Sequence, residues 1–136
     1  MTILENQLTV SDFSHLFQSA GWGCPCEKMI QVSLEKSYAT FSVEEDGKVI
    51  GMARLLGDGG MAFYLKDFVI LPEFQGQGIG KALLEYVENF IKNELEDGWT
   101  TCLELMSAKG KEEFYKKRGF EERPTETGGA GMHKML

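Results

Sequence analysis

The order of hydrophobic patterns along the chain predicts an α/β (α+β) protein, with helices packed on a mixed, mostly antiparallel sheet. Helical periodicity dominates the N-terminal part, strand-like runs follow, and a long helical run occupies 78–95. An Asp-Gly pair at 46–47 joins two of the strand-like runs, a strong hairpin signal because both turn positions need positive φ. We expect one domain over 1–136, with about six to seven strands and about four helices.

Two helices are expected before the first strand. The earlier one would be capped by Ser11, and its apolar residues recur at helical spacing: Phe13, Leu16, Phe17 and Ala20. The later one is expected at 25–36, because proline is favoured at the first helical position. Its buried stripe would be Met29, Ile30 and Leu34.

Strands are expected at 38–45 and 48–56, on either side of the Asp-Gly turn, with a second turn at 57–60. The run 61–71 is rich in aromatic and β-branched residues and predicts a long central strand. Pro72 should end this strand, because proline cannot donate a ladder hydrogen bond. The remaining elements follow in order: the long helix at 78–95, a strand at 99–106, a short helix at 109–118, and closing strands at 120–123 and 132–136.

Composition and charge narrow the classes of function. The net charge of −7 argues against a nucleic-acid partner, because such binding needs clustered Lys and Arg. It suits a cationic substrate such as an amine, and it equally suits an acidic surface that only aids solubility. No apolar run approaches the roughly 20 residues that span a bilayer. No signal peptide is recognised, so we expect no membrane partner and a cytoplasmic location.

The 3 cysteines do not form the even, regular set of a disulfide framework. Cys24 and Cys26 have C-x-C spacing without a second cysteine pair, so we expect reduced thiols and no metal site.

The segment Gln75 to Lys81 is a glycine-rich loop between a predicted strand and a predicted helix. Glycine lets the backbone turn tightly and approach a ligand closely. The first amides of a helix lack internal partners and favour negative charge, so this arrangement predicts an anion site, most often for phosphate. A P-loop is excluded because Gln75 and Ala82 stand where it needs Gly and Ser or Thr, and a dinucleotide fingerprint is excluded by Lys81.

The motif Gln75-x-x-Gly78-x-Gly80 resembles the Gln/Arg-x-x-Gly-x-Gly/Ala motif of the GCN5-related N-acetyltransferase (GNAT) family. The run 69–73 resembles the strand that precedes this loop in the family, and 114–120 resembles its second motif, Phe-Tyr-x-x-x-Gly-Phe. The resemblance in element order covers nearly the whole chain. It implies a GNAT fold and acetyl-CoA as co-substrate.

The resemblance also implies roles for individual residues. The loop would hold the coenzyme A pyrophosphate, the bulged central strand would pair with the pantetheine arm and polarise the thioester through the Val69 or Ile70 amide, and Tyr115 would protonate the leaving sulfur. Packing alone remains an alternative for Tyr115. The implied cofactor-binding set is Phe68, Val69, Ile70, Gln75, Gly76, Gln77, Gly78, Ile79, Gly80, Lys81, Ser107 and Phe114. Ser107 departs from the asparagine that the family often has there, and Lys111 stands where alanine is common.

The acceptor amine must lose a proton, because an alkylamine of pKa near 10.4 is almost wholly protonated at neutral pH. Asp67 and Glu104 are the candidate general bases, and a solvated or paired carboxylate is the alternative for each. Three functions therefore compete: acetylation of a small-molecule amine, acetylation of a protein lysine or N-terminus, and acyl-CoA sensing without turnover. Many members of the family are dimers, so we expect a homodimer.

Overall fold

The structure, a computed structural model, describes residues 1–136 and divides the chain into two compact units, Met1–Glu104 and Leu105–Leu136. A 5-stranded sheet runs in the order β1-β2-β3-β4-β5. Its strands are β1 (Thr2–Glu5), β2 (Ala39–Glu45), β3 (Lys48–Gly57), β4 (Ala62–Ile70) and β5 (Cys102–Leu105). The helices are α1 (Val10–Ser19), α2 (Glu27–Lys36), α3 (Ile79–Glu94) and α4 (Glu112–Lys116), with a short 3-10 turn at Pro72–Phe74. The predicted fold class is confirmed.

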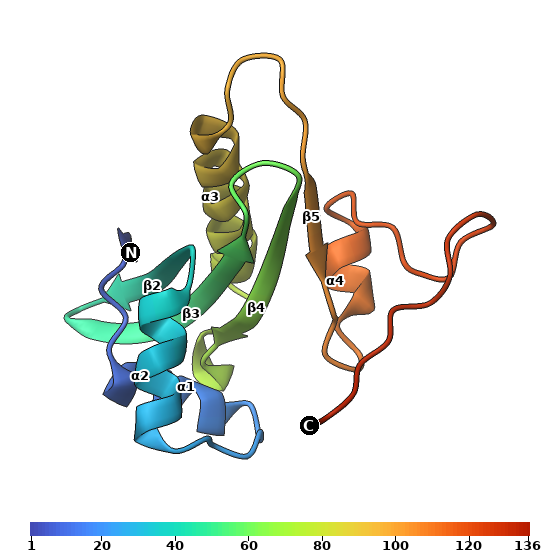
Figure 1. The fold of residues 1–136 in the computed structure, drawn as a ribbon. Helices are drawn as coiled ribbons and strands as arrows, with labels where there is room; N and C mark the ends of the chain where they lie inside the picture. Colours follow the sequence, from blue (N-terminus) through green and yellow to red (C-terminus); the bar gives the residue numbers. More distant parts are fainter. The chain divides into compact units, whose positions relative to one another are not determined.

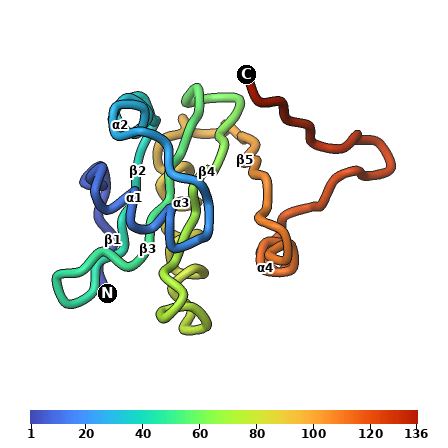
Figure 2. Tube along the Cα trace, turned by 90° about the horizontal axis from the view of Figure 1, so that it is seen from below, coloured from blue at the N-terminus to red at the C-terminus, as the bar shows by residue number.

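The first four strands pair antiparallel with their neighbours. The amide of Cys102 donates to the carbonyl of Met61 at 3.5 Å, so β5 begins beside the start of β4. The arrows of these two neighbouring strands point the same way in Figure 1. Figure 2 shows the strands succeeding one another from the β1 edge in this order. In Figure 1, α2 passes in front of β2 and β3, and α3 stands behind them.

The core of the first unit lies between the sheet and its helices. Phe41 on β2 is fully buried and packs edge-on against two rings of α3, Tyr86 at 5.9 Å and Phe90 at 5.2 Å between centroids. The apolar face of α3 adds further buried side chains: Ile79, Leu83, Leu84, Val87 and Ile91. Burial of this stripe explains why the predicted helical period was correct for α3. No helix is both long enough and apolar enough to cross a membrane.

The hairpin between β2 and β3 is confirmed at its predicted turn. Asp46 and Gly47 have φ of 50° and 74°, the left-handed pair that such a turn needs. The central strand and its end before Pro72 are confirmed as well, with β4 one residue shorter at each end than expected.

The predicted start of each N-terminal helix was wrong. The cap of α1 is Thr9, whose extended backbone lets its hydroxyl accept from the Asp12 amide at 3.1 Å; Ser11 lies inside the helix. Helix α2 begins after Cys26, which has extended φ and ψ, so Pro25 precedes the helix rather than opening it. Of the predicted stripe, Ile30 is buried but Met29 is 60% exposed.

The strand count of about six to seven was also too high. β1 was missed, while the closing strands at 120–123 and 132–136 are absent. The C-terminal hydrogen bonds are local instead: the Thr125 amide donates to the Gly128 carbonyl, and the Gly128 amide donates back to the Thr125 hydroxyl, both at 2.8 Å. This turn lies between the two predicted strands, and neither 120–123 nor 132–136 has a strand partner in the sheet. β5 and α4 are shorter than predicted, and Gly119, at φ 91°, follows α4 as expected.

Candidate active site

The glycine loop joins the end of β4 to the start of α3. Gly76 and Gly78 have left-handed φ of 76° and 82°, a conformation that other residues rarely adopt. A Cβ built at either position would meet no atom within 4 Å. The chain therefore needs these glycines for backbone direction and not for internal packing, and the space beside them is open to a ligand.

The first turn of α3 offers backbone donors to that space. Gly78 caps the helix without a side-chain hydrogen bond, and the first helical bond runs from the Ala82 amide to the Gly78 carbonyl at 3.0 Å. The amides of Ile79, Gly80 and Lys81 precede this bond. With the positive end of the 16-residue helix dipole behind them, they fit a pyrophosphate group.

Side chains of the loop hold its shape. The Gln75 Nε2 donates to the Ile70 carbonyl at 2.9 Å, which ties the loop to the last residue of β4. Gln77 Nε2 donates to the Glu73 carbonyl at 3.4 Å. Because these two side chains bond to the protein itself, the groups of the loop left to meet an anion are the backbone amides after Gln75 and the exposed ammonium of Lys81.

The expected bulge in the central strand is confirmed. Between the pairs Met52–Val69 and Arg54–Lys66, one residue of β3 lies opposite two residues of β4, Asp67 and Phe68. Asp67 has a φ of 51°, the left-handed conformation found at one class of bulge. The bulge lies directly before the residues expected to contact the thioester and the pantetheine arm.

The strand beside β4 is short. β5 has 4 residues and starts next to Met61, so it accompanies only the first half of β4. No strand of the sheet continues beside Val69 and Ile70 on that side. This edge can accept an extended ligand in the manner of an added strand.

Asp67, one candidate base, forms an ion pair. Its Oδ2 accepts from Arg54 Nε at 2.7 Å, and the two side chains are 10% and 14% exposed. This pairing alone accounts for a carboxylate at so buried a position. The structure therefore gives Asp67 the paired environment that was the alternative to a general base.

Glu104, the other candidate base, lies on β5 at a cleft of about 310 Å³. The pKa of the Tyr64 phenol in the same cleft is raised, mainly because the phenol is partly buried and to a smaller extent because the Glu104 carboxylate is near it. Asp58 at the rim accepts from the Gly60 amide at 2.8 Å and the Ala62 amide at 3.1 Å, and these bonds lower the pKa of its carboxyl. Asp67 is not among the lining residues, which are Leu56, Gly57, Asp58, Ala62, Phe63, Tyr64 and Glu104.

The second unit carries Tyr115 on α4. Tyr115 is 9% exposed and packs edge-on against Phe114 at 5.0 Å and Phe120 at 5.7 Å. Burial raises the pKa of the Tyr115 phenol to about 12, so the phenol keeps its proton at any physiological pH. In the same unit Ser107 Oγ donates to the Ala108 carbonyl at 2.8 Å.

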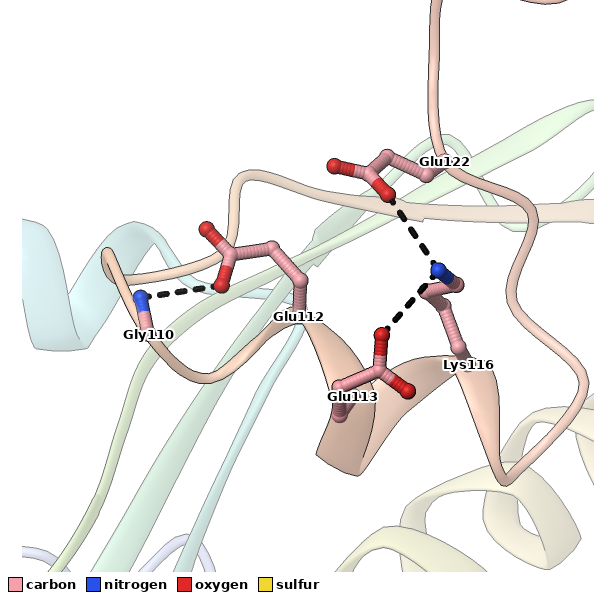
Figure 3. Close-up of polar contacts among 5 residues, drawn as sticks. All are labelled: Gly110, Glu112, Glu113, Lys116 and Glu122. Carbon is pink, nitrogen blue, oxygen red and sulfur yellow. Dashed lines mark hydrogen bonds and ion pairs between the residues drawn. The ribbon is translucent and has the colours of Figure 1, made fainter.

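Exposed charges fix the ends of α4 (Figure 3). The Gly110 amide donates to Glu112 Oε2 at 2.9 Å at the start of the helix. Lys116 Nζ lies 3.1 Å from Glu113 and 3.6 Å from Glu122, which ties the helix to the segment after it. These surface contacts are local to the segment that carries Tyr115, and each contributes little stability because its side chains are exposed.

No three His, Cys, Asp or Glu side chains come together as a metal site, and the thiols of Cys24, Cys26 and Cys102 are free and exposed. Two residues of the site, Arg54 and Tyr64, were not predicted from the sequence because their patterns are weak. Arg54 lies mid-strand and is recognised only through its partner Asp67 across the bulge. Tyr64 alternates with buried Phe63 and Leu65, a pattern that places it on the other face of β4.

The fold, the bulged strand and the glycine loop define an N-acetyltransferase domain, and a model of the acetyltransferase (GNAT) domain matches residues 36–122. The chain therefore belongs to the GNAT family. An uncharacterised N-acetyltransferase, ycf52, from Pyropia yezoensis is 27% identical over 121 residues, 86% of this chain and 67% of the relative. The ycf52 protein of Gracilaria tenuistipitata var. liui is 31% identical over 121 residues, and the match covers 86% of this chain and 64% of that protein.

Solved structures agree with the sequence comparison. A protein of unknown function from meticillin-resistant Staphylococcus aureus, a probable acetyltransferase, superposes with a TM-score of 0.85 at 27% identity. The match covers 99% of this chain and 98% of that one. The chain spans about two thirds of the length of the ycf52 relatives it matches.

Proposed function

We propose that the protein transfers an acetyl group from acetyl-CoA to the primary amine of a small molecule, by direct attack in a ternary complex. The observation that carries this proposal is the open, left-handed loop at Gly76 and Gly78, which enters α3 directly after a bulged β4. That combination presents helix amides to a pyrophosphate and a strand edge to a pantetheine arm.

Acetyl-CoA would be held by consecutive parts of the chain. The pyrophosphate would meet the loop from Gln75 to Lys81 through the backbone amides that follow Gln75, whose own amide donates to the Pro72 carbonyl at 3.2 Å. The pantetheine arm would extend along Phe68, Val69 and Ile70. Ser107 and Phe114 are assigned to this set through the family's motif.

In the proposed reaction, each bond that forms is matched by one that breaks. The neutral amine nitrogen forms a bond to the thioester carbon, the carbon–sulfur bond breaks, and the sulfur receives a proton. Tyr115 is the proposed donor because its phenol, with a pKa of about 12, is protonated throughout the working range. A thiol has a pKa of about 8.5, so complete proton transfer from a phenol of pKa about 12 is uphill on its own. Tyr115 therefore first donates a hydrogen bond to the developing thiolate, which lowers the barrier as charge appears. The proton that the amine loses then reaches the sulfur through Tyr115 or through solvent, and Tyr115 ends the reaction protonated.

The amine proton leaves to a carboxylate or to water beside it. Glu104 is the preferred base because it is exposed at a cleft, whereas the Asp67 carboxylate already accepts from Arg54. The cleft supports a small acceptor: its volume of about 310 Å³ is at the lower end of small-molecule sites. Asp58 and Glu104 place negative charge at its wall, in a chain of net charge −7, so a cationic amine suits it.

The test measures free thiol released from acetyl-CoA with polyamines, arylalkylamines, amino acids, aminoglycosides and a lysine peptide as acceptors. Calorimetry of acetyl-CoA alone runs beside it. Release with one class of small amine supports the proposal, and release with the peptide alone replaces it by a protein acetyltransferase. Binding without release indicates a sensor, and no binding refutes the role of the loop.

We further propose a homodimer in the cytoplasm, as the family resemblance and composition suggest. Light scattering of the purified protein tests the dimer, and fluorescence imaging of the tagged full-length protein tests the location.

A further inference from the structure

The bulge in β4 depends on an unusual residue. Asp67 and Phe68 together face the single residue Ala53, and Asp67 has a φ of 51°. Glycine is the usual residue at the left-handed position of such a bulge, because a side chain there is disfavoured. Aspartate tolerates this conformation better than most residues, yet the strand still needs something to hold it there.

The ion pair between the Asp67 carboxylate and Arg54 stabilises Asp67 in this conformation. The carboxylate accepts from Arg54 Nε at 2.7 Å, and Arg54 is the β3 residue at which the normal register resumes. With side chains only 10% and 14% exposed, the pair is shielded from solvent, where a charge-assisted bond is strong. Loss of either partner would leave a largely buried charge without its counterion.

The far end of the same stretch is also fixed. Gln75 Nε2 donates to the Ile70 carbonyl at 2.9 Å. The short run Phe68 to Ile70 is therefore held by a side chain at each end. A slip of one residue between these two anchors would turn every side chain and amide in the run to the opposite direction.

We propose that Arg54 and Asp67 form a clamp that positions the Phe68–Ile70 backbone for acyl transfer, and that Asp67 acts through this pair and not as the general base. The inference rests on the proposed acetyl transfer. Arg54 and Asp67 are positioning residues: they set the direction of the amides that meet the acyl donor and do not touch the reacting atoms.

A positioning role and a base role predict different patterns among variants. Asp67→Asn removes the countercharge of Arg54 but keeps an oxygen that can accept its hydrogen bond, and the amide cannot take a proton. It should lose less than about tenfold in kcat and keep the acid limb of the pH profile. Asp67→Ala and Arg54→Met should each lose about 100-fold, and the double variant should lose no more than either single one, because all three remove one clamp.

Asp67→Gly separates backbone strain from the ion pair, because glycine accepts the left-handed φ without strain. Glycine also allows many other conformations and gives Arg54 no partner, so the run Phe68 to Ile70 would lose its fixed direction. It should lose activity as Asp67→Ala does while keeping its thermal midpoint closer to that of the wild type. Glu35→Gln, which changes an exposed carboxylate on α2, is the matched control and should leave kcat unchanged.

Amide hydrogen exchange at Phe68, Val69 and Ile70 gives a readout that does not depend on turnover. Exchange should rise in Asp67→Ala and Arg54→Met and stay near the wild-type rate in Asp67→Asn. Absence of thiol release in the wild type would remove the proposed function, while the exchange pattern would still decide the clamp. Equal losses in Asp67→Asn and Asp67→Ala, with the acid limb gone, would overturn the inference and make Asp67 the base. Wild-type exchange and kcat in Asp67→Ala would overturn it as well.

Discussion

Replacing Gly78 by glutamate, beside the same change at Gly98, separates the ligand-binding role of the loop from its backbone strain. The two glycines have almost the same left-handed φ, +82° and +84°, and a Cβ would meet no atom within 4 Å at either. Each change costs about 1–2 kcal/mol of strain in the folded state. Each also adds one negative charge, so neither strain nor net charge distinguishes the pair. The two variants differ only in where the new carboxylate lies, because Gly78 caps the start of α3 and Gly98 lies in the turn after its end.

The expected difference in binding follows from Coulomb's law. A carboxylate about 5 Å from one phosphate charge, at an effective dielectric constant of about 20, repels it by about 3 kcal/mol. Acetyl-CoA should therefore bind the Gly78→Glu protein about 100-fold more weakly than the Gly98→Glu protein. Both proteins should unfold about 4–8 °C below the wild type, since they share the strain.

Titration calorimetry with acetyl-CoA measures the affinity, and circular dichroism on heating measures the midpoint. Wild-type affinity in both variants would refute the assignment of the pyrophosphate to the start of α3. Equal loss in both would show that backbone strain, and not the place of the charge, weakens binding.

Three further outcomes are expected. Burial raises the pKa of Tyr115 from 10.0 to about 12, so the folded chain keeps a proton that the unfolded chain releases, and the free energy of unfolding falls as pH rises from 10 to 12. Urea unfolding at several pH values should show that Tyr115→Phe removes about 2–3 kcal/mol of that fall. An unchanged fall in the variant would contradict this assignment. Thr9→Ala should cost about 1 kcal/mol as the loss of a helix cap, whereas Ser11→Ala should cost close to nothing, and equal thermal midpoints would reject Thr9 as the cap. Glu104→Gln should lower the pKa of the Tyr64 phenol, seen as an earlier rise of its ultraviolet absorbance on titration with base, and no change would contradict the proximity of the two groups.

Local patterns predicted the parts of the fold that local chemistry determines. The Asp46-Gly47 turn, the stop at Pro72 and the apolar stripe of α3 each depend on neighbours in sequence, and each is confirmed. β1 was missed because its 4 residues become a strand only by pairing with β2, from Thr2 opposite Glu44 to Glu5 opposite Phe41. The closing strands were predicted as two short runs around a glycine-rich loop, and such a local pattern does not show whether the rest of the sheet pairs with them.

The candidate site divides in the same way. The loop from Gln75 to Lys81 is contiguous, so its glycine spacing and the helix after it could be recognised together. The pairing of Arg54 with Asp67 could not be recognised from the sequence, because the two residues lie on different strands and meet only through the register of β3 against β4. A sequence shows an acidic residue in an apolar strand, but not the cation that neutralises it.

Met52 lies beside the bulge and can serve as a probe of its packing in nuclear magnetic resonance spectra. Of the 7 methionines, Met52 is fully buried, on β3 opposite Val69 beside the bulge. The others are exposed: Met1, Met29, Met61, Met106, Met132 and Met135. Labelling the methionine methyl groups with carbon-13 should therefore give one signal that responds to packing beside the bulge of β4. The six surface methyl groups in the same spectrum provide the reference against which a shift of that signal is read.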